Sequence, residues 1–75
     1  MKAYVLINAS PGRALDVAAK IKSQDGVTAA DAITGEYDVI AVCEAHDVNG
    51  IGQVIVDKIQ KVDGVFKTIT CLVVN

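Results

Sequence analysis

Hydrophobic positions follow two periods along this 75-residue chain, and the places where the period changes predict its elements. Residues 3–8 (AYVLIN) are β-branched or aromatic in the main, which is typical of a strand. The next hydrophobic residues recur three or four positions apart, as on one face of a helix. They are Ala14, Val17, Ala18 and Ile21. A strand followed by an amphipathic helix therefore opens the chain.

Local signals set the ends of this first helix. Ser10 is able to cap unpaired backbone amides, and Pro11 suits a first helical position. The helix is predicted to run to about Gln24, and Asp25-Gly26 stops it.

The middle of the chain is predicted to form a hairpin. Residues 27–34 (VTAADAIT) form a weaker strand, and residues 37–45 (YDVIAVCEA) form a stronger one. The turn between them is Thr34-Gly35-Glu36.

A second helix and a last strand complete the pattern. Asp47 is a plausible N-cap, and Gly50 and Gly52 weaken the first turns of the helix by up to about 1 kcal/mol each relative to alanine. Five hydrophobic residues share its inner face: Ile51, Val54, Ile55, Ile59 and Val62. Asp63-Gly64 ends the helix, and residues 65–74 (VFKTITCLVV) form the last strand.

The two halves of the chain resemble each other. KIKSQDGV at 20–27 aligns with KIQKVDGV at 58–65, so five residue types recur 38 positions on. Two copies of one βαβ unit would leave this trace. We therefore predict a ferredoxin-like α+β fold, β-α-β-β-α-β, with one four-stranded antiparallel sheet in the order 4-1-3-2.

Both faces of this sheet are apolar in the sequence. On the third strand Val39, Ala41 and Cys43 alternate with Ile40 and Val42, and the fourth strand is similar. Two helices cover only one face, and an antiparallel sheet with a solvated second face alternates apolar with polar residues. We expect a second copy to cover the other face, sheet against sheet, in a two-fold dimer.

Composition narrows the classes of function. Net charge is −2 and no basic run is present, so a surface for direct binding of nucleic acid is not expected. Hydrophobic runs are far shorter than the roughly 20 residues that span a bilayer, and the first residues do not resemble a signal peptide. These features predict a cytoplasmic protein without a membrane partner.

Catalytic and metal-binding patterns are absent from the sequence. His46 is the single histidine and lies beside a predicted helix cap, and Cys43 and Cys71 lie in apolar runs, as small buried hydrophobes do in a reducing compartment. Neither a metal site nor a cofactor is expected. SPGRALD offers a helix start and no phosphate-binding motif, and Arg13 is most simply a solvated side chain.

One stretch carries more chemistry than a turn requires. Gly35 permits a positive φ and lets a ligand approach the backbone. The turn amides can hold a carboxylate, Glu36 or Asp38 can pair with an ammonium group, and Tyr37 adds an amphipathic wall. These groups match those that a free α-amino acid requires. A solvated hairpin with Tyr37 packed at the end of the sheet would also account for these residues.

The whole chain resembles the ligand-binding (RAM) domain of the Lrp/AsnC family of transcriptional regulators. The segments that carry the resemblance are AYVLINASPGR, TGEYDVIAVCEAHD, KIQKVDGV and TITCLVV, and the most specific element is G-x-Y-D at 35–38. The chain starts at the first strand, so a stand-alone RAM domain of residues 1–75, without a helix-turn-helix DNA-binding domain, is expected.

The resemblance implies an amino-acid-sensing protein without catalytic activity. Family domains dimerise, assemble further into octamers or decamers and bind free amino acids at subunit interfaces, so mixed assembly with full-length Lrp/AsnC regulators is also implied. Carried over to this sequence, the effector-binding residues are Thr34, Gly35, Glu36, Tyr37 and Asp38, with Thr68 and Thr70 from a neighbouring strand or subunit. Asp38 is assigned the contact with the ammonium group.

Three alternatives remain at this stage. An ACT-like small-molecule sensor shares the element order and would bind near Gly12, so variants of Gly12 and Asp38 are expected to separate the two sensors. A dimeric α/β-barrel enzyme would need a general acid or base inside the sheet. A pure oligomerisation module would assemble without any dependence on an effector.

Overall fold

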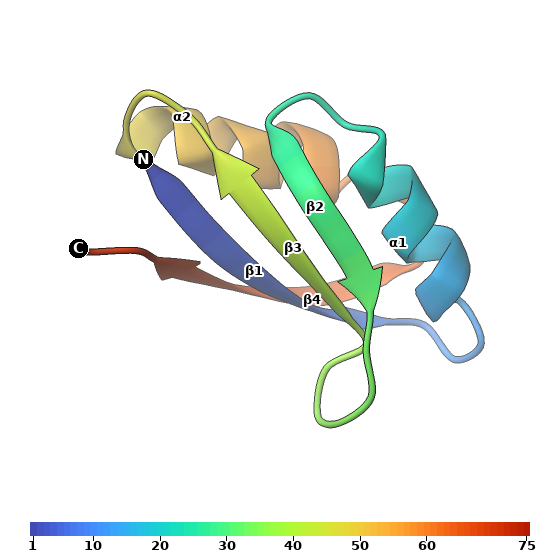
Figure 1. Ribbon diagram of the computed structural model, residues 1–75. Coiled ribbons are helices and arrows are strands. Elements are labelled where there is room, and N and C mark those ends of the chain that lie inside the picture. Colours follow the sequence, from blue (N-terminus) through green and yellow to red (C-terminus); the bar gives the residue numbers. More distant parts are fainter.

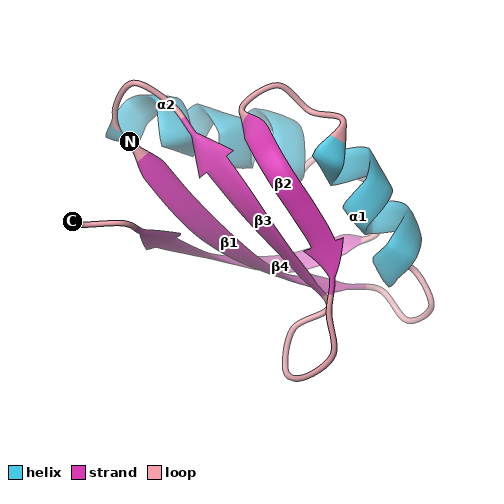
Figure 2. Ribbon diagram, in the orientation of Figure 1, coloured by secondary structure: helices cyan, strands magenta, loops and turns pink.

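Four antiparallel strands form one sheet, and the helices lie together on one face of it (Figures 1 and 2). The structure is a computed structural model that describes residues 1–75. In chain order its elements are β1 (Lys2–Ala9), α1 (Ala14–Lys22), β2 (Val27–Ala32), β3 (Val39–Glu44), α2 (Val48–Gln53), η1 (Val54–Ile59) and β4 (Val65–Leu72). The sheet order is β2-β3-β1-β4, which is the predicted order 4-1-3-2 read from the other edge. The ferredoxin-like α+β fold is confirmed.

The core fills the space between the helices and one face of the sheet. Strand β1 is central, and its residues Ala3, Val5 and Ile7 are fully buried. Ten further hydrophobic residues complete the core: Val17, Ala18, Ile21, Ala30, Val39, Ala41, Cys43, Ile51, Ile55 and Ile59. No polar or charged residue is buried, so hydrophobic burial is the main source of stability.

Helix α1 begins later than the sequence predicts. Ser10 does not cap it, because Pro11 and Gly12 form a turn in which the Arg13 N–H donates to the Ser10 carbonyl oxygen at 3.0 Å. Gly12 has φ +76°, a left-handed conformation that glycine adopts readily and that a helix excludes. The first helical residue is Ala14, no side chain caps the helix, and the helix ends at Lys22 rather than Gln24.

The second helical segment starts as predicted and then widens. The Asp47 carboxylate accepts a hydrogen bond from the Gly50 N–H at 2.8 Å, which confirms the N-cap. From Val54 to Ile59 the backbone is a π-helix, whose last bond joins the Gln60 N–H to the Ile55 carbonyl oxygen at 2.8 Å. The hydrophobic spacing in the sequence did not predict the change from α-helix to π-helix. Residues four positions apart lie on one face of the helix in both cases.

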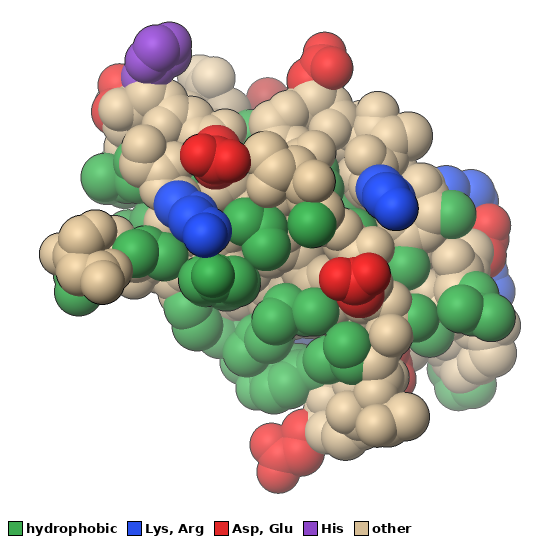
Figure 3. Space-filling model, viewed as in Figure 1, with side chains coloured by type: hydrophobic (Ala, Val, Ile, Leu, Met, Phe, Trp, Pro, Cys, Tyr) green, Lys and Arg blue, Asp and Glu red, His purple; other side chains and the backbone are tan.

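The opposite face of the sheet carries apolar side chains that nothing in the chain covers. The register pairs Tyr4 with Val42 on one side and with Cys71 on the other, and pairs Leu6 with Ile40 and Ile69. These residues alternate with the buried ones, and Figure 3 shows hydrophobic side chains over the strands. We call the set Tyr4, Leu6, Ile40, Val42, Ile69 and Cys71 the open face.

The expectation that both cysteines are buried is wrong for one of them. Cys43 is fully buried in the core, whereas Cys71 is exposed because it lies on the open face. Burial in apolar surroundings raises the pKa of the Cys43 thiol above its usual value. No helix of this fold is long and apolar enough to cross a membrane.

Candidate functional site

A loop projects from the sheet between β2 and β3 (Figure 1). It comprises residues 33–38, twice the length of the predicted three-residue turn, because β2 ends at Ala32 and β3 begins only at Val39. Thr34, Gly35 and Glu36 are exposed at its tip. Gly35 has φ +123°, and a Cβ atom there would meet nothing within 4 Å, so its backbone is open to a ligand.

Asp38 fastens the base of this loop to the end of the central strand. Its N–H donates to the Ile7 carbonyl oxygen at 2.9 Å, and its own carbonyl oxygen accepts from the Ile33 N–H at 2.8 Å. Its Oδ2 atom accepts from the Ala9 N–H at 2.7 Å. The carboxylate is therefore held in one place, and its Oδ1 atom has no hydrogen bond within the chain.

The loop backbone is held in a second way, by a side chain of β1. The Asn8 amide donates to the Glu36 carbonyl oxygen at 2.9 Å. Tyr37, between Glu36 and Asp38, is half-buried. The predicted motif residues thus form one compact unit at the end of β1.

Asp38 lines a hollow of about 270 Å³ together with the turn between β1 and α1. The other lining residues are Ala9, Ser10, Pro11, Gly12, Ala14 and Leu15. Asp38 is the single charged residue among them, and most of the rest offer hydrocarbon. A ligand with a cationic group next to a hydrocarbon chain would match this lining.

Two sites that the sequence kept apart meet in this hollow. Gly12, assigned to an ACT-like sensor, and Asp38, assigned to a RAM-like sensor, line the same space. Variants of these two residues therefore do not separate the two sensors. Ala9, Ala14 and Leu15 also line the hollow, although no motif in the sequence indicates them. The sheet order would have indicated them, because it places the start of β3 beside the end of β1.

Thr68 and Thr70 lie elsewhere in the single chain. They belong to β4, and β1 stands between β4 and β3. Their partners across the ladder are Ile7 and Val5, which point toward the helices. The Thr68 hydroxyl accepts a hydrogen bond from the Gln60 amide at 3.0 Å. Neither threonine lines the hollow.

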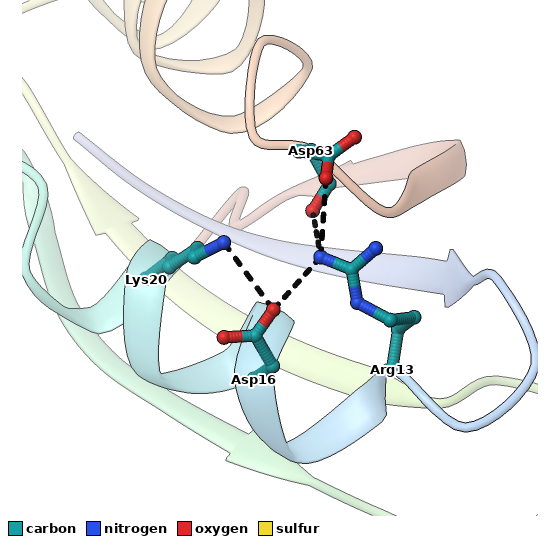
Figure 4. A network of polar contacts seen from close by, with 4 residues as sticks. All are labelled: Arg13, Asp16, Lys20 and Asp63. Atoms are coloured by element: carbon teal, nitrogen blue, oxygen red, sulfur yellow. Dashed lines mark hydrogen bonds and ion pairs between the residues drawn. The ribbon is translucent and has the colours of Figure 1, made fainter.

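A network of ion pairs borders the turn on its other side (Figure 4). Arg13 Nη2 lies 2.8 Å from Asp16 Oδ2 and 3.3 Å from Asp63 Oδ2, and Lys20 Nζ lies 3.3 Å from the same Asp16 oxygen. The hydrogen bond to Asp16, followed by that to Asp63, raises the pKa of Arg13. Donation by Arg13 and then Lys20 lowers the pKa of Asp16. The prediction that Arg13 is merely solvated is wrong.

Other chemistry-bearing residues do not gather. His46 is exposed after β3, as its position beside a helix cap predicts. No three His, Cys, Asp or Glu side chains are grouped so that they could hold a metal ion.

Comparison with known sequences identifies the family. Residues 2–75 match the family described as the Lrp/AsnC ligand binding domain. The chain belongs to this family. An HTH-type transcriptional regulator of Pyrococcus horikoshii is 31% identical over 71 residues, which are 91% of this chain and 47% of that protein. A regulator of Pyrococcus furiosus is 30% identical over the same length. The chain thus spans about half the length of the curated relatives it matches.

Solved structures agree with this assignment. A Thermus thermophilus protein, TTHA0845, is 28% identical with a TM-score of 0.91, covering 99% of this chain and 92% of that one. AsnC of E. coli is 27% identical with a TM-score of 0.89, covering 99% of this chain and 50% of that one. The E. coli chaperone NapD shares the fold at 18% identity and a TM-score of 0.76. The Lrp/AsnC assignment therefore rests on sequence, because the fold alone is shared more widely.

Proposed function

We propose that this Lrp/AsnC domain is a sensor that binds a free α-amino acid in the hollow beside Asp38. The observation that carries the proposal is the position of the Asp38 carboxylate: it comes from the G-x-Y-D motif, it is fixed by the Ala9 N–H, and it lines the hollow with one oxygen unpaired. Membership of a ligand-binding family supports the same reading.

Each part of an amino acid has a proposed partner. The ammonium group pairs with the Asp38 carboxylate, since a charge-assisted hydrogen bond is stronger than a neutral one. The carboxylate extends out of the hollow toward the backbone amides around Gly35, which is exposed and has free space around its Cα. The ligand side chain packs against Pro11, Ala14 and Leu15 of the hollow. Leu15 is 79% exposed and gains apolar contact when the hollow is filled.

Binding is proposed to act through assembly. The open face is apolar, and a second copy packed sheet against sheet would remove it from water. Dimers then assemble further into octamers or decamers, with Thr68 and Thr70 of one subunit near the loop of another. An effector shifts this equilibrium only by its differential affinity for the assembly states. Full-length Lrp/AsnC regulators are the proposed mixed partners, which would link the sensor to transcription.

One regulator that shares this fold was solved together with an amino acid. A transcriptional regulator of Neisseria meningitidis, 21% identical with a TM-score of 0.84, was solved in complex with L-Met. That observation belongs to the Neisseria protein. For this chain it recommends methionine among the amino acids to be tested.

The direct test is a thermal-shift screen of the protein with the twenty amino acids, repeated on Asp38→Asn. Asparagine keeps an oxygen that can accept the Ala9 N–H but removes the charge. A ligand at 100 times its dissociation constant stabilises by about 2.7 kcal/mol, which raises the melting midpoint by roughly 10 to 20 °C in a domain of this size. We expect one or a few amino acids to raise the midpoint of the original protein and to lose this effect in Asp38→Asn.

Asp31→Asn is the matched control, because Asp31 is an exposed carboxylate on β2 that does not line the hollow. It should respond as the original protein does. If no amino acid shifts the midpoint of the folded, oligomeric protein, the sensor proposal is wrong and a pure assembly module is the better account. An equal loss in both variants would also contradict the role of Asp38.

The dimer has its own test. Leu6→Asp places a charge at the centre of the open face, while the neighbouring core residues stay unchanged. Light scattering should then give a smaller mass than the assembly of the original protein. An unchanged mass would exclude the open face as the interface.

A further inference from the structure

A groove of about 250 Å³ lies between the end of α1 and the π-helical segment η1, away from the hollow beside Asp38. Three lysines line it, Lys20 from α1 and Lys58 and Lys61 from the second helical segment and its end. Ser23 and Gln24 add neutral polar groups, and Asp57 is the single carboxylate. We call this the lysine groove.

The lysine groove lies between the two sequence repeats. Lys20 and Lys58 are equivalent positions, 38 residues apart, and Ser23 is the equivalent of Lys61. Equivalent residues of the two halves thus line the same groove. Three of the seven basic residues of a chain with net charge −2 thus line this groove.

No lysine side chain of the groove donates a hydrogen bond to a carbonyl oxygen at a helix end. Cations are favoured near helix C-termini. At the end of α1, however, the Lys20 carbonyl oxygen accepts from Ser23 Oγ at 2.8 Å and from Gln24 Nε2 at 3.4 Å. Lys20 Nζ pairs with Asp16, whereas Lys58 and Lys61 have no ion-pair partner. Two lysines without an ion-pair partner and a third that shares Asp16 therefore line one groove.

We propose that the lysine groove binds a small, multiply charged phosphate-bearing anion, for which inorganic pyrophosphate is the simplest probe. Such an anion relieves repulsion among like charges, and lysine binds phosphate groups as a point charge. The groove is too small, and the rest of the surface too acidic, to provide a track for a nucleic-acid backbone. The proposal is independent of amino-acid binding.

Isothermal titration of the intact protein with pyrophosphate tests the proposal. The double variant Lys58→Ala/Lys61→Ala should weaken binding at least tenfold. Lys2→Ala/Lys67→Ala is the matched control, because it removes the same charge from the strands, outside the groove, and should change affinity less than twofold. Binding should weaken as salt is raised. Asp38→Asn should bind pyrophosphate unchanged, so failure of this proposal and failure of the amino-acid sensor are distinguishable.

Three results would overturn the proposal. The first is absence of pyrophosphate binding at low salt. The second is an equal loss in the two double variants, which would mean a diffuse charge effect. The third is binding of duplex DNA through Lys58 and Lys61 without binding of pyrophosphate.

Discussion

The two halves of this domain repeat one strand–turn–helix plan, but their turns differ in structure. In both halves an amide at the end of the first strand donates to a glycine carbonyl oxygen of the other half. Ser10 N–H bonds Gly64 at 2.8 Å, and Glu44 N–H bonds Gly26 at 2.9 Å. The two halves also pack alike, since Ile21 and its equivalent Ile59 are both fully buried. The repeat therefore secures the fold.

The turns after β1 and β3 have diverged into an open and a closed form. After β3, Asp47 caps α2, and a Cβ atom on Gly50 would lie 2.8 Å from the Cβ of Ala45. After β1, no side chain caps α1, and a Cβ atom on Gly12 would meet nothing within 4 Å. The closed turn stabilises the helix start, whereas the open turn leaves the hollow that Asp38 lines.

The largest effect should come from the glycines that join the halves. In Gly64→Ala the new Cβ would lie 2.8 Å from Val17 Cγ2 at a φ of +100°, so clash and backbone strain add. We expect a loss of roughly 2 to 4 kcal/mol in the free energy of unfolding. Gly26→Ala should lose a comparable amount, because its Cβ would lie 2.6 Å from Val54 Cγ2. Urea denaturation measures both.

Gly12→Ala is the control for these variants, with a φ of +76° but free space around it. It should cost only the backbone term, about 1 to 2 kcal/mol. A loss as large as that of Gly64→Ala would mean that the turn after β1 is packed and the hollow does not persist in solution.

The next effect separates the two helix starts. Asp47→Ala removes a side-chain cap and should lower the free energy of unfolding by about 1 kcal/mol, or about 4 to 8 °C in the melting midpoint. Ser10→Ala should change the free energy of unfolding by less than about 0.5 kcal/mol, because Ser10 caps nothing. Equal losses in the two variants would contradict the open form of the first turn.

The smallest effect concerns the ion pairs beside the open turn. The pKa of Asp16 is lowered in the folded protein, so its contribution to stability is present above the usual aspartate pKa of about 3.9 and is lost as pH falls through the lowered value. Asp16→Asn should therefore reduce the acid-induced loss of stability, and 1 M salt should reduce it in the original protein. Thermal melts of both proteins from pH 6 to pH 2 measure this difference. If the melting midpoints of the two proteins fall in parallel, the proposed contribution of Asp16 is contradicted.

The sequence predicted most of the fold because that information is local or periodic. The repeated K-I and D-G-V segments, the alternation in β3 and the Asp47 cap each indicate one element, and the sheet order follows from a small set of allowed topologies. The start of α1 was missed because two start signals, Ser10 and Pro11, are overridden by the left-handed Gly12.

The candidate site was predicted only in part, because its two walls are distant in sequence. G-x-Y-D marks the wall from residues 35–38, but nothing local shows that Ser10–Leu15 forms the other. The bond from Ala9 N–H to Asp38 brings them together, across 29 positions. Likewise, the pairing of Arg13 with Asp63, 50 positions away, could not be predicted without the three-dimensional structure.

Amide chemical-shift mapping by NMR tests the central claim most directly, with the amino acid that gives the largest thermal shift as the ligand. The account predicts that the amides of Ala9, Ser10, Gly12 to Leu15 and Thr34 to Asp38 shift together and saturably, while those of Ala45 to Gly50 in the closed turn stay unchanged. Shifts confined to the closed turn, or an absence of shifts around Asp38, would contradict the assignment of the open turn as the amino-acid site.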